Sequence, residues 1–508
     1  MRLESTAMAD TDNAFQQCIS PDCQATFGVE EVHVSCPNCL RKNRQSLLDI
    51  RYDWSRTAVP KAMDFFEHRW MTKGEQVTGS LDFSGVWRFR ELLPFFRDEN
   101  QVVTIGEGRT NLQNARLLAK QVGLRPGNLF LQYEGLNPSG SFKDNGMAAA
   151  FTHAKMVGAR KVACASTGNT SASLAMFASL SSMTGIVFVG TGKIAYGKLS
   201  QALDYGARTL QIQGDFDACL RRVRQIAADR PQLGIYLMNS VNPFRLEGQK
   251  AIIYRVLEAL DWNVPDWIVL PGGNLGNSAA FGKALAELHE LGLIQRIPRI
   301  AIIQATGANP LYELFAEQGV RWNGGDVDRS VVSDYYQQLD AADHHAQTIA
   351  SAIEIARPVN LFKALRTLEV THGVVREVDD ETILDYKALI GRYGFGCEPA
   401  SATSVAGTHY LVKEGVIGAD ETVVCILTGH VLKDPDATVK YHTGIDMKAA
   451  KMPVPQAKPS GQFATEPVQV PDDLNRIIDA IGADPAGIDQ MESDPDGNPA
   501  GDLPVSEY

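Results

Sequence analysis

Lys143 has surroundings that suit covalent chemistry. It lies in the run NPSGSFKDNG, residues 137–146, where small and turn-forming residues precede the helix-favouring run MAAAFTHAKM. A lysine near a helix N-terminus feels the positive end of the helix dipole and loses hydration, and both effects lower the pKa of its amine. A neutral amine attacks aldehydes, so this position suits Schiff-base formation. The alternative is a lysine that caps a surface turn and pairs with Asp144.

Two glycine-bearing turns provide candidate sites for an anion. KVACAS leads into STGNTSAS, residues 166–173, and WIVL leads into PGGNLGN, residues 271–277; a helical run follows each turn. At such junctions backbone N–H groups and a helix dipole point at one spot, which favours phosphate. Neither turn has the spacing of a P-loop or of GxGxxG, so nucleotides are not favoured. Together with Lys143, the turns indicate an aldehyde that carries phosphate, and pyridoxal 5'-phosphate fits that description.

Four of the eight cysteines form two close pairs near the N-terminus, in CISPDC (Cys18, Cys23) and CPNC (Cys36, Cys39). Two such pairs separated by a short stretch predict a zinc ribbon, in which four sulfurs surround a structural zinc ion. Four thiolates leave no open coordination position, so we expect no catalytic role. The alternative is a set of reduced cysteines without metal. The remaining cysteines are scattered and predicted to be buried as small apolar residues: Cys164, Cys219, Cys397 and Cys425.

The elements that must position these residues alternate between β-rich runs and amphipathic helical runs from about residue 100 to 450. Examples are KVACAS before LAMFASLSS, and WIVLPGG before AAFGKALAELHELG. This alternation predicts an α/β fold with parallel sheets, whose ligands gather at the carboxyl ends of the strands. The predicted divisions are a ribbon-like segment (1–50), a large domain (51–145 and 241–450), a small α/β domain (146–240) and a disordered acidic tail (451–508).

Composition and charge narrow the classes of partner. The chain has 508 residues, 44% of them apolar, and a net charge of −12. Residues 452–508 hold 11 acidic residues against Lys458 and Arg476, a balance of −9, so the rest of the chain carries −12 + 9 = −3. Such a balance argues against nucleic acid as a partner. No apolar run is long enough to span a bilayer, and the N-terminus lacks a signal-peptide core, so we expect a cytoplasmic protein without a membrane partner.

Seven motifs, in this order, resemble those of one enzyme family: GEGRTNL, NPSGSFKDNGM, ASTGNTSAS, LMNSVNPFRLEGQK, DWNVPDWIVLPGGNLGN, ASAIEIARP and ILTGHVLKDP. The chain resembles the threonine synthases, which are fold type II pyridoxal-phosphate enzymes related to the tryptophan synthase β chain, over about residues 100 to 450. The run around PDWIVLPGGNLGN is most similar to the plant-type branch. Some members of the family also carry an N-terminal cysteine ribbon. Two departures are Asn145, where Arg or Leu is more familiar, and the acidic tail.

The resemblance implies a cofactor-binding role for several residues. Lys143 would form the Schiff base with the cofactor and then move protons at Cα and Cβ of the substrate. Asn169 would bond to the ring oxygen, and Thr428 would face the ring nitrogen, where a hydroxyl leaves the ring largely neutral; the alternative for Thr428 is a local backbone hydrogen bond. The cofactor phosphate would be held by Gly273, Asn274, Leu275, Gly276 and Asn277.

The resemblance also implies a second set of residues that bind the substrate. Thr170 would bind the substrate carboxylate, and the substrate phosphate would be bound by Asn239, Ser240 and Arg245. Arginine is the natural bidentate partner of phosphate, although Arg245 could instead pair with Glu247 on the surface. Glu398 lies in a plausible site loop, but we assign it no role, and we expect His430 to be structural.

The reaction implied by the resemblance converts O-phospho-L-homoserine and water to L-threonine and phosphate, in a protein expected to be a homodimer. Alternatives on the same fold are a cysteate synthase that uses phosphoserine and a threonine or serine dehydratase. The arginine in NSVNPFR argues against a dehydratase, because an unphosphorylated substrate needs no second anion site. An alternative from another class is a non-catalytic adaptor that binds the cofactor or zinc. The set Lys143, Asn169, Arg245 and Thr428 argues against that alternative.

Overall fold

The computed structural model describes residues 13–71, 81–166, 168–190, 196–212, 216–444, 461–463 and 475. The chain divides between Ala437 and Thr438 into two units, and the elements below belong to the first, except the end of α15 (Pro435–Thr443). Apart from residues 461–463 and 475, the predicted acidic tail lies outside the described residues, as do residues 1–12 of the ribbon-like segment. No helix within the described residues is long and apolar enough to cross a bilayer.

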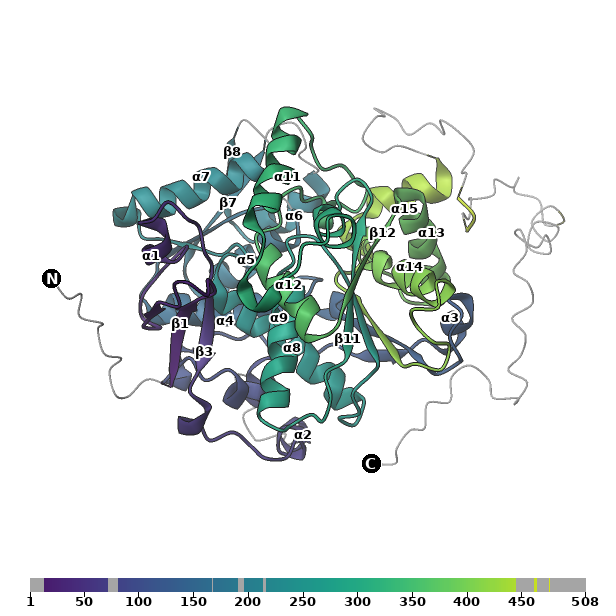
Figure 1. The fold of residues 1–508 in the computed structure, drawn as a ribbon, viewed down its shortest axis with the longest axis horizontal. Coiled ribbons are helices and arrows are strands. Elements are labelled where there is room, and N and C mark those ends of the chain that lie inside the picture. The colour runs from purple at the N-terminus through teal and green to yellow at the C-terminus, as the bar shows by residue number, and fades with distance from the viewer. Residues whose placement is uncertain are drawn as a thin grey trace. The chain divides into compact units, whose positions relative to one another are not determined.

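The larger sheet has six strands in the order β12-β11-β10-β13-β5-β4. All neighbours are parallel except β4 and β5, which are antiparallel. The central strands are continuous apolar runs, as expected for a parallel sheet covered on both faces; Figure 1 shows α13 and α14 on one side and α9 and α12 on the other. The strands are β4 (Leu112–Asn114), β5 (Leu129–Tyr133), β10 (Trp267–Pro271), β11 (Arg299–Ala305), β12 (Val374–Val378) and β13 (Val423–Leu427).

The helices around the larger sheet often begin at a polar cap. Asn242 is one such cap: its side chain accepts hydrogen bonds from the backbone of Phe244 and Arg245, and Pro243 follows it at the first helical position. The α-helices outside the smaller sheet are α1 (Pro37–Leu40), α2 (Asp64–Met71), α3 (Arg116–Gln121), α8 (Pro243–Ala259), α9 (Gly276–Glu290), α10 (Pro310–Tyr312), α11 (Arg329–Ala341), α12 (Leu361–Val370), α13 (Asp380–Arg392) and α14 (Pro399–Lys413).

The smaller sheet has four parallel strands in the order β8-β7-β6-β9. Its strands are β6 (Lys161–Ala165), β7 (Thr184–Gly190), β8 (Arg208–Ile212) and β9 (Ile235–Leu237), and the accompanying helices are α4 (Lys143–Met156), α5 (Asn169–Leu180), α6 (Tyr196–Asp204) and α7 (Phe216–Asp229). Two parallel-type sheets built from alternating strands and helices confirm the predicted α/β fold class.

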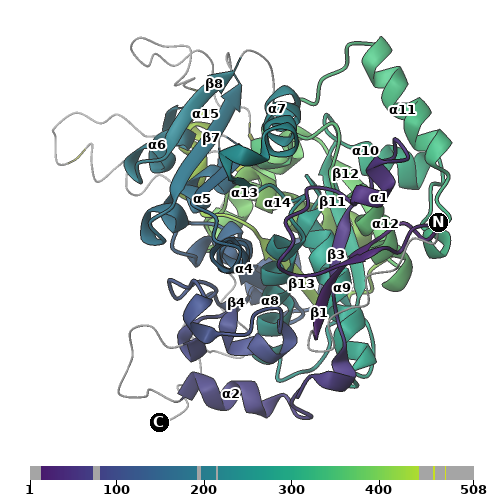
Figure 2. The ribbon, with the colours of Figure 1, turned by 90° about the vertical axis from the view of Figure 1, so that its left-hand side faces the viewer.

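The N-terminal segment forms a separate antiparallel sheet, β2-β1-β3, from β1 (Ala14–Cys18), β2 (Thr26–Phe27) and β3 (Leu48–Tyr52). β3 packs against α8, and Figure 2 shows β1 and β3 close to the helices of the larger sheet. Asp49 on β3 pairs with Lys363 at 2.9 Å and with Arg366 at 2.6 Å, both on α12. The segment is therefore joined to the larger sheet's helices through buried charges.

Tyr52, at the end of β3, reaches a buried ion cluster between α8 and α9. Its hydroxyl donates to Glu247 at 2.7 Å. The cluster alternates acidic and basic residues, with Glu247 paired to Lys250 at 2.7 Å and to Lys283 at 2.6 Å, and Glu287 completing the square. Removing one member of a buried set leaves an unpaired charge, which costs about 3–5 kcal/mol. The cluster therefore fixes α8 and α9 relative to each other.

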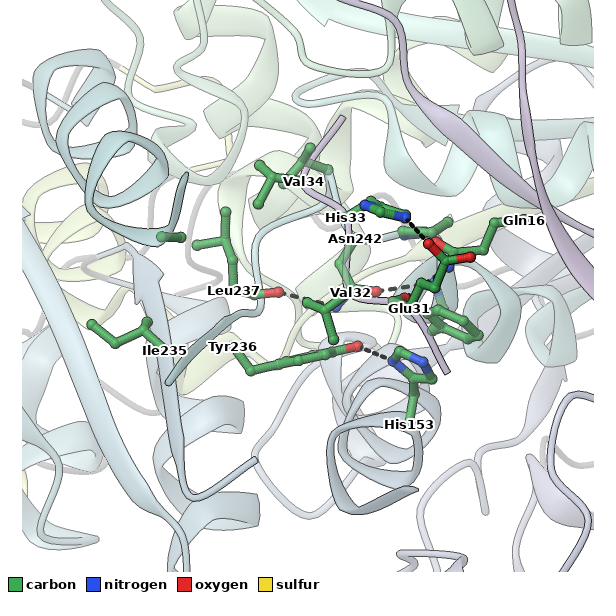
Figure 3. A pocket seen from close by; sticks show the side chains of 14 residues that line it. Gln16, Glu31, Val32, His33, Val34, His153, Ile235, Tyr236, Leu237 and Asn242 are labelled. Atoms are coloured by element: carbon green, nitrogen blue, oxygen red, sulfur yellow. Dashed lines mark hydrogen bonds and ion pairs between the residues drawn. The ribbon is translucent and has the colours of Figure 1, made fainter. Parts of the chain in front are cut away.

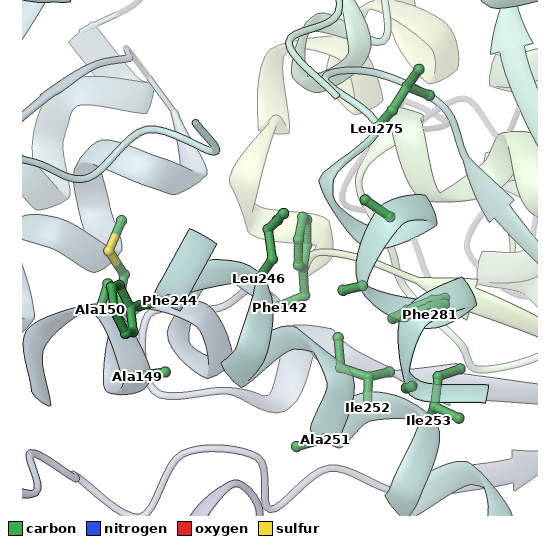
Figure 4. Close-up of a cluster of buried hydrophobic side chains, with 14 of the residues drawn as sticks. Phe142, Ala149, Ala150, Phe244, Leu246, Ala251, Ile252, Ile253, Leu275 and Phe281 are labelled. Atoms are coloured by element: carbon green, nitrogen blue, oxygen red, sulfur yellow. The ribbon is translucent and has the colours of Figure 1, made fainter. Parts of the chain in front are cut away.

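Three core residues each precede or follow a predicted site residue. Phe142, Leu246 and Leu275 are buried in the same hydrophobic cluster, and Figure 4 shows Phe142 beside Leu246, with Leu275 nearer the start of α9. They adjoin Lys143, Arg245 and Gly276. Burying each side chain contributes about 1.5–3 kcal/mol, so one core holds all three turns in place.

Candidate functional site

Lys143 lies at the carboxyl end of β13, because the loop before it is attached there. The N–H of Phe142 donates to the carbonyl oxygen of Thr428 at 2.9 Å, and the N–H of His430 donates to that of Gly140 at 2.9 Å. Lys143 is the first residue of α4, and its Nζ lies 3.7 Å from the centroid of the Phe142 ring. The sheet edge where ligands of such folds bind therefore carries this lysine.

The amine of Lys143 lies in an environment that favours its neutral form. Burial, followed by the positive charge of Arg245, lowers the pKa of Lys143 well below its usual value, and Glu398 opposes the shift. Asp144 is fully buried and accepts hydrogen bonds from the Ser139 backbone (2.7 Å), the Ser139 hydroxyl (2.6 Å) and the Ser173 hydroxyl (2.6 Å). The alternative of a surface turn with a Lys143–Asp144 pair is therefore wrong.

The turn before α9 presents a row of free backbone donors. Leu275 has the left-handed φ of 61°, and among the described residues no acceptor is found for the backbone N–H groups of residues 273–278. The buried Oδ1 atom of Asn277 also has no partner within the described residues. Asn274, in contrast, accepts hydrogen bonds from the backbone of Val359 and Asn360. An anion placed at this helix start would satisfy the free donors.

The turn before α5 has the same character. α5 begins at Asn169, and the backbone N–H groups of residues 169–171 have no acceptor within the described residues. Thr170 is nearly buried, and its Oγ1 lies 3.4 Å from Nη2 of Arg245. The predicted carboxylate site and the predicted phosphate-binding arginine therefore adjoin each other.

Glu398 connects two predicted cofactor-binding residues and is the main residue that sequence reasoning missed. Its carboxylate accepts hydrogen bonds from Nδ2 of Asn169 at 2.8 and 3.1 Å and from the hydroxyl of Thr428 at 2.9 Å. It lies at the N-cap of α14 and is 4% exposed. The signal in the sequence was a glutamate directly before a helix-starting proline in GCEPAS. The hydroxyl of Thr428 thus donates to the Glu398 side chain, and not to the local backbone as the alternative for Thr428 had it.

Arg245 is a buried cation without a carboxylate partner among the described residues. It is 2% exposed, and its Nη1 donates to the carbonyl oxygen of Met238 at 2.7 Å. Its Nε has no partner within the described residues. Burial lowers the pKa of Arg245 to about 10, which leaves it charged at neutral pH. Glu247 pairs with Lys250 and Lys283 instead, so the alternative of a surface Arg245–Glu247 pair is wrong.

Asn239 and Ser240 lie next to Arg245 but differ in what they offer a ligand. The amide of Asn239 pairs with both the N–H and the carbonyl oxygen of Ala165, each at 3.0 Å, so this side chain mainly ties the loop to β6. The carbonyl oxygen of Ser240 accepts from Asn360 at 3.1 Å. A Cβ on Gly276 would lie 3.6 Å from the Cβ of Ser240, which places Ser240 against the start of α9.

Asn145, the departure from the family pattern, lies beneath the start of α4. Its Nδ2 donates to Glu134 at 2.7 Å and to the carbonyl oxygen of Phe142 at 2.9 Å. Glu134 is itself fully buried and paired with Arg255 at 2.7 Å. Asn145 therefore supports the Lys143 turn from behind, a structural role.

Comparison with known proteins decides the family. Residues 103–429 match the model of the pyridoxal-phosphate dependent enzymes. A threonine synthase from Methanocaldococcus jannaschii is 40% identical over 84% of this chain and 94% of its own length. The chain belongs to the threonine synthase family. A second relative, threonine synthase 2 (chloroplastic) from Arabidopsis thaliana, is 34% identical over 84% of this chain and 79% of its own. The family predicted from the motifs is confirmed, and so is the prediction of a pyridoxal-phosphate enzyme.

A solved structure supports the fold of this family member. Diaminopropionate ammonia lyase from Escherichia coli matches with a TM-score of 0.53, at 15% identity, over 66% of this chain and 88% of its own. This likeness concerns the fold alone.

The residues of the site fit pyridoxal phosphate. The free N–H groups of residues 273–278 form an anion cradle, and Lys143 supplies an amine with a lowered pKa. Gly168, directly before α5, has open space where a Cβ would stand, so the backbone there is accessible to a flat ring. The donor set and the space thus match a cofactor with one phosphate and one aldehyde.

The four N-terminal cysteines form a cluster of the geometry that zinc requires. Their sulfur atoms all lie within 4.8 Å of one another, and the pairs Cys18–Cys39 and Cys23–Cys36 are each separated by 3.7 Å. Zn–S bonds of about 2.3 Å in a tetrahedron separate the sulfurs by about 3.8 Å. These cysteines could therefore hold a structural zinc ion. The other four cysteines are buried, as predicted.

A separate small cavity lies between the N-terminal segment and β9, with a volume of about 60 Å³. Figure 3 shows His33, Glu31 and His153 around it. Both ring nitrogens of His153 are engaged, with the Tyr236 hydroxyl at 2.6 Å and the carbonyl oxygen of Val29 at 2.5 Å. Burial lowers the pKa of His153 to about 4. This histidine is a neutral structural residue.

Proposed function

We propose that the protein converts O-phospho-L-homoserine and water to L-threonine and phosphate, with Lys143 as the catalytic residue. The observation that carries the proposal is the presence of two separate anion sites near one lysine of lowered pKa. One is the start of α9, and the other is the guanidinium of Arg245, which has no carboxylate partner among the described residues and an Nε without any partner there. A cofactor phosphate and a substrate phosphate together require two such sites.

The cofactor's place follows from the first site. We assign its phosphate to the backbone of Gly273, Asn274, Leu275, Gly276 and Asn277. Asn169 is assigned to the ring oxygen and Thr428 to the ring nitrogen. Pyridoxal phosphate, when bound, supplies an electron-withdrawing ring that stabilises negative charge on carbons next to the amino group.

The substrate's place follows from the second site. Arg245 holds the phosphate group before and after its bond to the carbon chain breaks, because a guanidinium binds phosphate in two-point fashion. Ser240 and the remaining N–H of Asn239 are assigned to the same group. Thr170 and the free N–H groups at the start of α5 bind the carboxylate.

Lys143 moves the protons. An amine of lowered pKa can accept a proton near neutral pH, first from Cα and then from Cβ, and can give protons back once the phosphate has left. The balance of the reaction needs a proton at Cγ, which becomes the methyl group, and a proton at Cα, while water supplies the hydroxyl at Cβ. The attachment of residues 140–142 to the end of β13 keeps this amine at a fixed position.

The predicted domain bounds are part of this proposal. The strands of the larger sheet fall in 51–145 and 241–450, and those of the smaller sheet fall in 146–240, which supports the division. The homodimer and the cytoplasmic location stay predictions from the sequence.

The test is release of phosphate from O-phospho-L-homoserine, with threonine identified as the product. Lys143→Ala should abolish both phosphate release and the borohydride-reducible adduct at residue 143, whereas the chain should keep its melting temperature. An active Lys143→Ala variant would contradict the proposal. Phosphoserine with sulfite tests a cysteate synthase in the same assay. Unphosphorylated threonine and serine, offered as substrates, test for a dehydratase. Rapid turnover of either would contradict the assignment of Arg245 to the substrate phosphate.

A further inference from the structure

The two candidate anion sites lie on loops that follow strands of different sheets. The turn of residues 273–277 follows β10 of the larger sheet, whereas Asn239 and Ser240 follow β9 of the smaller sheet. The amide of Asn239 pairs with the backbone of Ala165 on β6, so this loop is tied to the smaller sheet. Neither sheet alone therefore sets the distance between the two loops.

Asn360, the residue directly before α12, joins the two loops through its side chain. Its Nδ2 donates to the carbonyl oxygen of Ser240 at 3.1 Å and to that of Asn274 at 3.2 Å. The backbone N–H of Val359 donates to Oδ1 of Asn274 at 3.2 Å, which adds a second contact to the cofactor turn. One amide group thus contacts the predicted substrate loop and the predicted cofactor turn.

The contacts fix the orientation of the Asn360 amide. Turning it over would place its oxygen against two carbonyl oxygens, which cannot donate. As oriented, its Oδ1 atom has no partner within the described residues, although the residue is fully buried. The contribution of an asparagine at this position is therefore its two donors.

The helix that follows Asn360 is held on two sides. Lys363 on α12 pairs with Asp49 of β3 at 2.9 Å. The hydroxyl of Thr367, on the same helix, lies 2.8 Å from the carbonyl oxygen of Ser278 on α9. Because α12 is anchored to the N-terminal segment and to α9, Asn360 contacts the two loops from a fixed position.

We propose that Asn360 is a positioning residue that sets the distance between the two anion sites and so selects the length of the substrate. The inference rests on the proposed function, in which the amino group of the substrate lies at the cofactor and its phosphate at Arg245. The carbon chain between them must match that distance, and O-phospho-L-homoserine has one methylene group more than O-phospho-L-serine. A fixed pocket discriminates between ligands that differ by one methylene by about 10- to 200-fold.

The test compares the two compounds on the holoenzyme. The Michaelis constant is measured for O-phospho-L-homoserine, and O-phospho-L-serine is added as a competitor, whose inhibition constant does not depend on its being turned over. The wild type should prefer the longer compound, and Asn360→Ala, which lacks both donors, should reduce this preference by about tenfold or more. Asn360→Ser keeps one donor, so its preference should lie between those two, and it replaces Asn360→Ala if that variant does not fold.

Ligands that occupy one site alone separate this role from a structural one. Calorimetric titration of the holoenzyme with inorganic phosphate measures the Arg245 site, and titration of the apoprotein with pyridoxal phosphate measures the turn before α9. Both dissociation constants should change by less than about threefold in Asn360→Ala, because each site keeps its own donors. A loss of either affinity as large as the loss of preference would overturn the inference, since Asn360 would then support each site by itself.

Thr367→Val is the matched control, because it removes a contact of α12 that does not involve Ser240 or Asn274. It should melt at a lower temperature and keep the wild-type preference, and a reduced preference in this variant would overturn the inference. A wild type that releases no phosphate from O-phospho-L-homoserine overturns the proposed function and this inference with it. Turnover with the same preference in the wild type and the Asn360 variants overturns this inference alone.

Discussion

Glu398 accepts a hydrogen bond from the Thr428 hydroxyl at 2.9 Å, across 30 residues of sequence. The backbone reinforces the contact, since Cys397 and His430 form an isolated bridge and the Glu398 N–H donates to the Gly429 carbonyl. The end of β13 and the start of α14 are thus locked together, with Lys143 attached to the same strand end. A substitution at Thr428 therefore changes the predicted cofactor site and also weakens the contact between the end of β13 and the start of α14.

Thr428→Val tests this contact, since valine has the shape of threonine without its hydroxyl. The substitution leaves a buried carboxylate with one donor fewer, so we expect the free energy of unfolding to fall by about 1–3 kcal/mol. Turnover should fall more than apparent substrate affinity. Thr428→Ser is the matched control because it keeps the hydroxyl, and it should retain most of the stability and most of the turnover. Denaturant unfolding and steady-state kinetics measure the two effects, and equal behaviour of the two variants would contradict the role of the hydroxyl.

Arg245→Ala should lower kcat/KM for the phosphorylated substrate by about 100-fold or more, because a buried charge-pair partner is worth about 2–5 kcal/mol. Arg245→Lys keeps the charge but not the two-point geometry, and its loss should be smaller. Inorganic phosphate should inhibit the wild type and inhibit Arg245→Ala far less. Unchanged phosphate inhibition in the alanine variant would place the substrate phosphate elsewhere.

Gly273→Ala and Gly276→Ala form a matched pair in the cofactor turn. A Cβ on Gly273 would lie 3.0 Å from Cα of Ile353, a backbone atom that cannot move aside easily, whereas on Gly276 the nearest atom is 3.4 Å away. We expect Gly273→Ala to weaken pyridoxal-phosphate binding about tenfold, or 1.4 kcal/mol, and Gly276→Ala to change it little. Cofactor titration of the apoprotein measures the affinity of each variant for pyridoxal phosphate. Equal affinities in the two variants would argue against this turn as the binding site of the cofactor phosphate.

Cys39→Ser should remove the zinc ion, because three thiolates bind it much more weakly than four. The wild type, purified with zinc present, should carry one zinc per chain by elemental analysis, and the variant none. The variant should also melt at a lower temperature. Cys164→Ser, which changes a buried cysteine of β6 outside the cluster, should retain the metal. A wild type without zinc would favour the alternative of metal-free cysteines.

His153 should make the fold sensitive to acid. Its folded-state pKa of about 4 lies below the unfolded value of about 6.5. As the pH falls, the unfolded chain therefore takes up a proton at this histidine before the folded chain does. The contribution to stability is complete above pH 6.5 and declines by roughly 3 kcal/mol as the pH falls to 4. His153→Gln should flatten this part of the stability profile in denaturant titrations at several pH values. An unchanged slope would show that other groups control it.

The sequence predicted the turns of the site better than its internal contacts. Lys143 and the starts of α5 and α9 could be located because each rests on local rules for strands, glycine turns and helix starts. The packing of Phe142, Leu246 and Leu275 in one core was not predicted, although Leu275 was predicted to hold the cofactor phosphate, because their meeting depends on how α4, α8 and α9 pack.

The role of Glu398 could not be read from GFGCEPASATS. Its contacts reach Asn169, which is 229 residues away along the chain, and no local pattern encodes such a pairing. Asn239 shows the same limit in the opposite direction, since its family role suggested a ligand contact while its amide is paired with Ala165. Polar side chains in a site have several possible partners, and the fold decides among them.

The docking of β3 limits how this chain can be shortened. Asp49 supplies the carboxylate partner of the buried Lys363, and Tyr52 completes the hydrogen bonding of Glu247. A chain that began after Tyr52 would lose the carboxylate that pairs with Lys363, and no other carboxylate within the described residues pairs with this buried lysine. Lys363 lies on α12, the helix that follows Asn360 and its contact with Ser240. The N-terminal ribbon is therefore an integral part of the catalytic unit, and a gene truncated to the sheet domains would encode an incomplete protein.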